Sequence, residues 1–375
     1  MGKYMKKLIA LGLLFVSISA NAVEYNIAVL EGLGGNASAY GLNESGQVVG
    51  NAYNADSGLV EAVIWNNGVI QSLGFQGIAR AVNNAGTVVG ENGSNATSNN
   101  TGDGRAYKWD SVNGYVDLGD LNAAFAGAWD INESGVITGS SFYNTDSPFG
   151  LGTQHAFRWE NGTMIDLEPP NPTEGYSRGI AINDAGTVIG RAAVDKFGNS
   201  DKYMAQWDTS GGFFHDSPPG NYSAGRDINN LDIAVGISRT GIDTFNRAAI
   251  WDADGNVTIL GTLGGERSEL SAINDSGVAV GMAQAAGNAK TAMAVFDGAT
   301  LVDLNGLVDL SGTGIIRLTE AFDINANGDI VGIGITASGE TKAFLMTAVP
   351  VPAAVWLFGS ALGLLGWMRR GRTAN

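Results

Sequence analysis

The sequence predicts an all-β fold: a seven-bladed β-propeller of four-stranded blades, closed by interleaved N- and C-terminal strands, plus a C-terminal hydrophobic helix. Three observations predict it. A phrase of the form Ile-Asn-x-x-Gly-x-Val-Val-Gly recurs seven times, a second phrase of the form Ala-x-x-Trp follows most copies, and the chain has 55 glycines but only 8 prolines. A repeat of this length with two hairpins per copy is typical of a propeller blade.

The first phrase predicts a hairpin turn. Its asparagines lie 40 to 51 residues apart, and all but one are followed three residues later by glycine. Asn is favoured at the first position of a type I turn and Gly at the fourth, where φ is often positive. The exception is Asp232, a residue type that also tolerates positive φ. The predicted turn residues are Asn43, Gly46, Asn83, Gly86, Asn132, Gly135, Asn183, Gly186, Asn229, Asp232, Asn274, Gly277, Asn325 and Gly328.

The second phrase predicts the third and fourth strands of each blade. Examples are Ala62–Trp65, Ala106–Trp109 and Ala248–Trp251, each followed by a turn and a short apolar strand. Each repeat therefore supplies two hairpins. Near the end of the chain, 342–346 forms a third strand that no fourth strand follows. Residues 25–30 resemble the fourth strand of an earlier repeat, so we expect the N-terminal strand to complete the last blade and close the ring.

Residues 1–22 have the order of a secretory signal peptide. Three lysines precede a short apolar segment, and the segment ends in Ala20-Asn21-Ala22, an A-x-A cleavage site. We expect cleavage after Ala22 by signal peptidase and export across the inner membrane.

Residues 349–375 form a separate C-terminal tail. Val349, Pro350, Val351 and Pro352 make a hinge, 16 uncharged residues follow, and Arg369 and Arg370 come directly after them. A helix of that length spans roughly 24 Å, slightly less than a hydrocarbon core of about 30 Å. Cationic flanks stay on the cytoplasmic side. The tail therefore predicts a transmembrane helix with a cytoplasmic C-terminus.

The tail resembles the PEP-CTERM sorting signal of Gram-negative bacteria, with Val351 in the place of the family's glutamate. This resemblance implies processing by an exosortase at the cell surface, in organisms that make extracellular polysaccharide. A permanent membrane anchor is the alternative. The repeats of residues 25–346 resemble the HAF-repeat family of exported proteins, whose name motif occurs as His155-Ala156-Phe157. That family implies a repetitive β fold and no established enzymatic activity. The domains are therefore expected at 1–22, 23–348 and 349–375.

The charge of residues 23–348, which we call the body, limits the classes of ligand that it can bind. The chain has 21 Lys and Arg residues and 37 Asp and Glu residues; three lysines lie in the signal and three arginines in the tail, so the body has 15 basic and 37 acidic residues, a net charge of −22. Such a body repels nucleic acid and anionic lipid. Without cysteine it has no disulfide and no cysteine nucleophile.

The sequence contains no motif of an enzyme, and we expect no catalytic residue and no cofactor. Its two histidines, His155 and His215, are interpreted as structural. Acids beside the repeated turns would lie on one face of a propeller, where calcium binding is the open alternative; they are Glu44, Glu133, Asp184, Asp275 and Asp329. Aromatic residues in or near longer connections are candidates for stacking on sugars; they are Tyr143, Phe149, Tyr176, Phe197 and Tyr222.

These features together predict an exported, non-enzymatic repeat protein that acts in or on extracellular polysaccharide or biofilm matrix. Two alternatives stay open at this point. One is a propeller enzyme that degrades the polysaccharide, and the other is a calcium-dependent carbohydrate-binding propeller.

Overall fold

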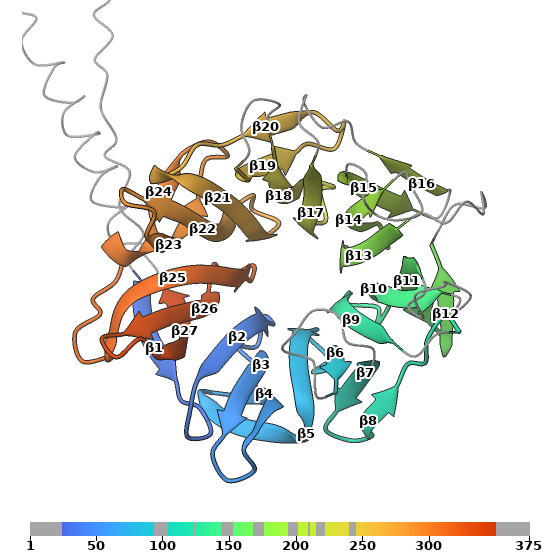
Figure 1. Cartoon of the computed structure of the whole chain (residues 1–375), viewed down its shortest axis with the longest axis horizontal. Helices are drawn as coiled ribbons and strands as arrows, with labels where there is room; N and C mark the ends of the chain where they lie inside the picture. Colours follow the sequence, from blue (N-terminus) through green and yellow to red (C-terminus); the bar gives the residue numbers. More distant parts are fainter. Residues whose placement is uncertain are drawn as a thin grey trace, which may run out of the picture.

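The computed structural model describes residues 25–93, 104–122, 125–143, 153–167, 176–193, 202–208, 211–214, 222–239 and 245–349. Within these residues the fold is all-β, built from antiparallel sheets that stand side by side around a central axis (Figure 1). The signal segment 1–22 and, apart from Val349, the sorting tail lie outside the described residues. Among the described residues no helix is long and apolar enough to cross a membrane.

The first sheet along the chain has seven strands, because one long strand belongs to two hairpin sets. It contains β2 (Ala37–Leu42), β3 (Val48–Asn54), β4 (Leu59–Asn66), β5 (Val69–Val82), β6 (Val88–Asn92), β7 (Arg105–Asp110) and β8 (Gly114–Asp117). The first part of β5 pairs with β4 as far as Gln76, and the second part pairs with β6 from Gly77 onward. The strand therefore ends one repeat and begins the next.

Four four-stranded sheets follow in chain order. They are β9 (Ala126–Ile131), β10 (Ile137–Tyr143), β11 (Thr153–Glu160) and β12 (Thr163–Asp166); β13 (Tyr176–Ile182), β14 (Val188–Ala193), β15 (Lys202–Asp208) and β16 (Gly211–Phe214); β17 (Ser223–Ile228), β18 (Ala234–Ser238), β19 (Arg247–Trp251) and β20 (Val257–Ile259); and β21 (Gly264–Ile273), β22 (Ala279–Ala285), β23 (Lys290–Val295) and β24 (Leu301–Asp303). A 3₁₀-helix, η1 (Leu304–Gly306), leads to the last sheet.

The last sheet joins the two ends of the body, as the sequence predicts. It has the order β1 (Tyr25–Leu30), β27 (Thr341–Ala348), β26 (Ile330–Thr336) and β25 (Ile315–Ile324). β1 pairs antiparallel with β27 from Tyr25 opposite Ala348 to Leu30 opposite Ala343. The first strands of successive repeats also contact one another in the closed order β2, β5, β9, β13, β17, β21, β25 and back to β2. Both ends of the body therefore meet in one sheet of the ring.

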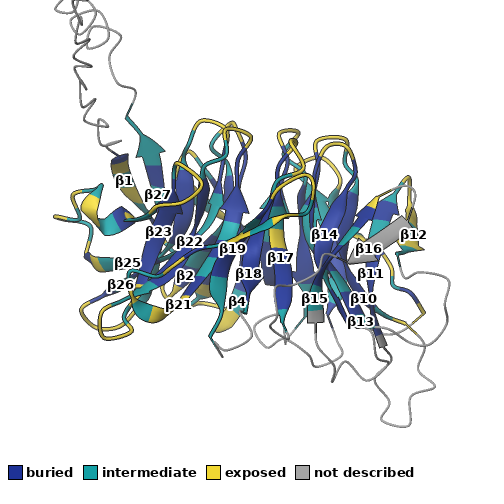
Figure 2. Ribbon diagram, turned by 90° about the horizontal axis from the view of Figure 1, so that it is seen from above, coloured by how far each residue is buried: buried dark blue, intermediate teal, exposed yellow. Residues whose placement is uncertain are grey.

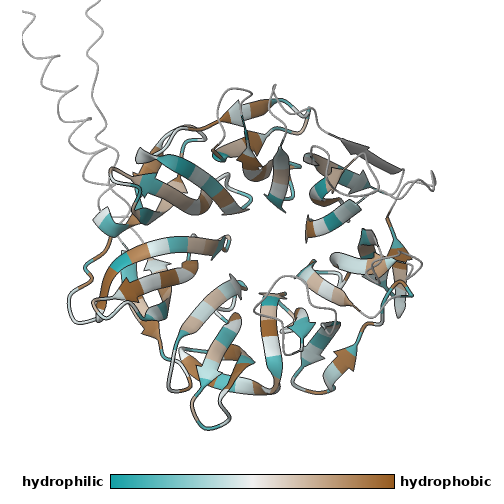
Figure 3. Cartoon of the chain, in the orientation of Figure 1, coloured by the Kyte–Doolittle hydropathy of each residue, from teal (hydrophilic) through white to brown (hydrophobic). Residues whose placement is uncertain are grey.

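The core lies between neighbouring sheets, and hydrophobic residues are distributed around the whole ring (Figure 3). Residues are buried along the strands and exposed mainly at the connections (Figure 2). The tryptophans of the second phrase supply much of this core, since Trp65 and Trp251 are fully buried. Burying a large apolar side chain contributes roughly 1.5–3 kcal/mol.

A β-bulge, which the repeated phrases do not predict, occurs at the same place in the first strand of every repeat. At this place one residue is skipped in the pairing of each repeat, and β21 and β25 have further register shifts nearer their starts. The residues at the shared position are Tyr40, Arg80, Trp129, Ile180, Arg226, Ser271 and Phe322. The final Gly of each phrase lies opposite this region. A Cβ at Gly190, for example, would overlap the carbonyl oxygen of Arg178. The bulge is the reason why the phrase ends in glycine.

Candidate functional site

The repeated asparagines form a closed circuit of hydrogen bonds around the axis. Each is buried, and its Nδ2 donates to the backbone carbonyl of the corresponding Asn in the next repeat, at 3.0–3.3 Å. The circuit runs from Asn43 to Asn83, Asn132, Asn183, Asn229, Asn274 and Asn325, and Asn325 donates back to Asn43. A side chain from the last repeat thus contacts the first, which links all the repeats.

Each of these asparagines also holds its own turn. Its carbonyl accepts the N–H of the residue three positions later, as expected for the predicted turn. Its Oδ1 accepts the N–H of the residue four positions later in all seven copies. Gly46 and the other predicted glycines have positive φ, and so does Asp232, at 56°. Asn is required because its amide is both donor and acceptor.

A second set of contacts surrounds the circuit on the exposed side. The N–H of Glu44 donates to Asn84 Oδ1, that of Asn84 to Glu133, and that of Glu133 to Asp184 Oδ1. The series continues through Asn230 to Asp275, and Ala326 donates to Glu44. Asp329 instead accepts from Ala348. The predicted turn acids therefore lie on one face, but bind backbone N–H groups. No group of three or more Asp, Glu, His or Cys side chains in the described ranges could hold a metal ion.

Three aspartates beneath the circuit have the most perturbed carboxyl groups. Burial, together with repulsion from the Asp227 carboxylate, raises the pKa of Asp130 to about 8 and that of Asp323 to about 7, and burial raises the pKa of Asp227 to about 6. A strongly shifted pKa can mark a catalytic group. Here both oxygens of each carboxylate accept backbone N–H groups: Asp130 binds those of Ile131 and Ile182. The Asp130 carboxyl group therefore joins the backbone of two neighbouring repeats.

These carboxylates occur in alternate repeats and each one spans two. Asp227 accepts from Ile228 and Ile273, and Asp323 accepts from Ile324 and Leu42. Three aspartates thus satisfy six of the seven equivalent N–H groups. Among the described residues no carboxylate accepts from the remaining one, at Val82. Because each aspartate joins two repeats and there are seven repeats, the N–H group of one repeat has no such partner in the described ranges.

A polar groove of about 730 Å³ lies between the first two repeats, on the same face as the circuit. Its lining includes Asn66, Gln71, Asn84 and Asn113, together with Trp109 and Asp110. The volume is in the range of small-molecule sites. Trp109 is partly exposed, whereas the equivalent Trp65, Trp159, Trp207 and Trp251 are buried. The hydrogen bonds of Asn113 hold the pKa of Asp110 below its usual range, so this acid is an anion at neutral pH.

The amides of the groove are held in place by their neighbours. Gln47 donates to Asn66 Oδ1 at 2.7 Å and itself accepts from Asn43 of the circuit. Asp110 accepts from the backbone and side chain of Asn113. The groove is therefore built on the rigid turns that the circuit fixes. The sequence alone does not indicate this groove, because its residues come from four separate segments.

The other predicted residues have structural surroundings. His155 is buried, with Nδ1 2.9 Å from Asp166 Oδ2 and its ring stacked on Tyr143. Tyr176 and Tyr222 lie together, and both accept hydrogen bonds from Arg191. His215, Phe149 and Phe197 lie outside the described residues. So do the signal positions Ala20 and Ala22 and the tail positions Pro350, Val351, Pro352, Arg369 and Arg370.

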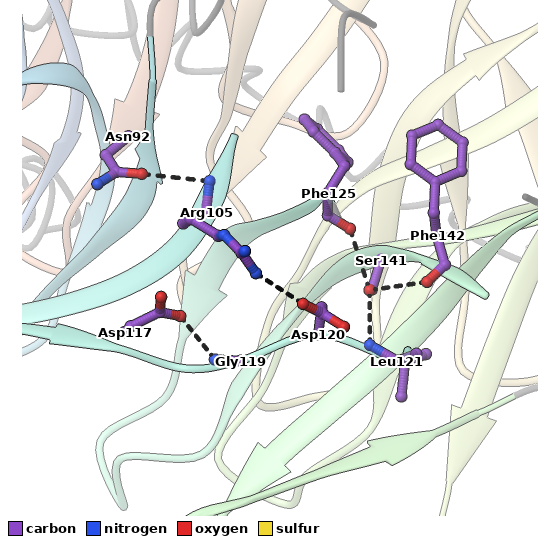
Figure 4. A network of polar contacts seen from close by, with 9 residues as sticks. All are labelled: Asn92, Arg105, Asp117, Gly119, Asp120, Leu121, Phe125, Ser141 and Phe142. Carbon is purple, nitrogen blue, oxygen red and sulfur yellow. Dashed lines mark hydrogen bonds and ion pairs between the residues drawn. The ribbon is translucent and has the colours of Figure 1, made fainter. Parts of the chain in front are cut away.

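A polar network fastens the connection between β8 and β9 (Figure 4). Arg105 forms an ion pair with Asp120 at 2.7 Å, and Asp117 accepts the N–H of Gly119. Ser141 Oγ accepts the N–H of Leu121 and lies 3.1 Å from the carbonyls of Phe125 and Phe142. Each polar group here has a local partner, so the network holds the second and third repeats together.

No protein-family model matches the sequence, and no curated protein matches it.

Proposed function

We propose that the body is a seven-bladed β-propeller, with the seven-stranded sheet counted as two blades that share β5. Three observations support this. The contacts between first strands and the asparagine circuit both return to the first repeat, and a bulge occurs at one position of every repeat. In this arrangement β1 is the fourth strand of the last blade. Deleting residues 25–30 should expose the edge of β27 and cause aggregation. A monomeric deletion variant with an unchanged melting temperature contradicts closure.

We propose further that this propeller is an exported protein that binds extracellular polysaccharide without cleaving it. The observation that carries the binding function is the groove beside Trp109. Sugar hydroxyls both donate and accept, as do the amides of Asn66, Gln71 and Asn84. Trp109 adds an apolar surface with an N–H at its edge. The non-enzymatic part of the proposal is supported by the aspartates beneath the circuit, whose carboxylate oxygens already bind backbone N–H groups.

The test is binding of the exported protein to the extracellular polysaccharide of its host. Trp109→Ala should weaken binding about 10-fold, as expected for loss of an aromatic stacking contact of about 1.4 kcal/mol. The matched control is Trp129→Ala, which alters an indole outside the groove. Equal affinity of Trp109→Ala and the unaltered protein would exclude the groove. Shortening of the polysaccharide, measured by its reducing ends, would instead favour the enzyme, and loss of binding with chelator would favour the calcium-dependent binder.

Export and sorting are proposed from the terminal segments. The signal at 1–22 and the PEP-CTERM-like tail at 349–375 support passage through signal peptidase and an exosortase, with tethering by the C-terminal helix. The described body ends at β27, directly before the Pro350 hinge. Cleavage at the hinge would therefore leave every strand in place. Mass spectrometry of the surface protein tests this: a mass that still includes residues 353–375 indicates a permanent anchor.

A further inference from the structure

Two arginines face each other across the pairing of β13 and β14. Arg178 lies directly opposite Arg191 in the register of these strands. Like charges at directly opposed positions destabilise a sheet. Burial lowers the pKa of the Arg178 guanidinium, and the charge of Arg191 lowers it further. This is an unusual concentration of positive charge on a body that has more than twice as many acids as bases.

The partners of these arginines are neutral. Arg191 donates to the hydroxyls of Tyr222 at 2.6 Å and Tyr176 at 2.9 Å, and its Nε is buried with no hydrogen-bond partner. Arg178 Nε donates to Gln154 Oε1 at 2.5 Å. A third guanidinium, that of Arg239, lies 4.7 Å from the centre of the Tyr222 ring. We call Tyr176, Arg178, Arg191, Tyr222 and Arg239 the arginine–tyrosine cluster.

Within the described part of the chain no carboxylate forms an ion pair with any of these three arginines. Four other arginines do have one: Arg80, Arg105, Arg158 and Arg226. Glu91 contributes attraction to Arg178, but its oxygen is bound by Arg80 at 2.7 Å. As far as the described residues extend, the cluster therefore has three positive charges without a paired anion. It lies on the face opposite the asparagine circuit, since Tyr176 begins the strand that ends before Asn183.

We propose that the arginine–tyrosine cluster binds the carboxylate of an acidic sugar in a polysaccharide. This rests on the proposed function and adds the class of saccharide. A guanidinium is planar and presents paired N–H groups that match a carboxylate. The Tyr222 hydroxyl accepts from Arg191 and still has its proton to donate. The body as a whole is strongly negative, so a chain with a carboxylate on every sugar would be repelled; a mostly neutral chain with spaced uronates fits better.

The experiment compares a polysaccharide that has one glucuronate per repeat with the same polymer after its carboxylates are reduced to alcohols. The exported protein should bind the reduced polymer about 10-fold more weakly, and Arg191→Gln should weaken binding of the acidic polymer by about the same factor, as expected for loss of a charge-assisted contact. Arg158→Gln is the matched control, because it removes the same charge on the other face. If Arg191→Gln lowers the melting temperature, Arg178→Gln replaces it.

The outcomes separate the two proposals. Equal binding of both polymers by all variants overturns the carboxylate site and leaves polysaccharide binding intact. Binding of neither polymer overturns the proposed function; the cluster is then probed with free glucuronate, and a binding signal lost in Arg191→Gln but kept in Arg158→Gln supports the anion site alone. Equal affinity for polyglutamate or inorganic phosphate contradicts the assignment to a sugar carboxylate.

Discussion

At the scale of single residues, the repeated asparagine has two functions in one side chain. Its Oδ1 closes the turn of its own repeat, and its Nδ2 joins that turn to the next. The sequence predicted the first function, because turn chemistry is local. The second depends on residues about 45 positions away, so only the three-dimensional arrangement shows it.

Replacing Asn183 by Asp tests the circuit. The carboxylate cannot donate to the carbonyl of Asn229 and places a charge where the side chain is buried, so we expect a loss of about 3 kcal/mol in the free energy of unfolding. Urea titration measures it. Asn26→Asp makes the same chemical change at an exposed position of β1 and should change stability by less than about 0.5 kcal/mol. Similar losses in both variants would argue against a special role for the circuit.

The aspartates beneath the circuit predict a pH dependence of stability. Their folded-state pKa values, about 6 to 8, lie above the ordinary value of 3.8. Between the ordinary value and these raised pKa values the folded state binds more protons at the three carboxyl groups than the unfolded state does. Their contribution to stability is therefore fully present below about pH 4 and is lost as pH rises through 6 to 8. The melting temperature should therefore fall between pH 5 and pH 9.

Asp130→Asn separates this titration from other effects. The amide has one acceptor oxygen, whereas both oxygens of the Asp130 carboxyl group accept backbone N–H groups, so we expect a loss of about 1–2 kcal/mol at pH 5. Because the amide does not titrate, the difference from the unaltered protein should narrow toward pH 9. Thermal unfolding over that range measures both quantities. A difference that widens with pH would mean that Asp130 is charged in the folded protein at pH 5.

At the scale of elements, each repeat combines a bulge in its first strand with a glycine in its second. The strand positions, the turns and the return of residues 25–30 to the last sheet all follow from the repeated phrases. The bulge does not, because residues as different as Tyr40, Arg80 and Ser271 occupy it. The only feature of the repeated phrase that accompanies the bulge is its final glycine. A turn or a packing contact would explain that glycine equally well.

Gly190→Ala tests the pairing of bulge and glycine. The added methyl group would overlap the Arg178 carbonyl, and backbone cannot move aside easily, so we expect about 3 kcal/mol of destabilisation. Gly261→Ala is the control, since a Cβ there meets no atom within 4 Å. Chemical denaturation of both variants gives the comparison. If Gly190→Ala is as stable as Gly261→Ala, the glycine is not there to make room for the bulge.

At the scale of the whole molecule, the two faces of the ring differ in their chemistry. The face with the circuit has the groove of amides beside Trp109, and the opposite face has the arginine–tyrosine cluster. The sequence predicted turn acids on one face and named Tyr176 and Tyr222, but it could not predict the groove or the pairing of Arg178 with Arg191. Both depend on strand register and on contacts between repeats, which composition and spacing do not specify.

Hydrogen exchange with and without the host's polysaccharide tests whether the groove beside Trp109 binds saccharide, because it locates binding on the folded protein. We predict slower exchange in the groove segments 66–71, 84–87 and 109–113 when polysaccharide is present, and no change in 256–261 on the far side of the ring. Unchanged exchange in all three groove segments at saturating polysaccharide would contradict the claim.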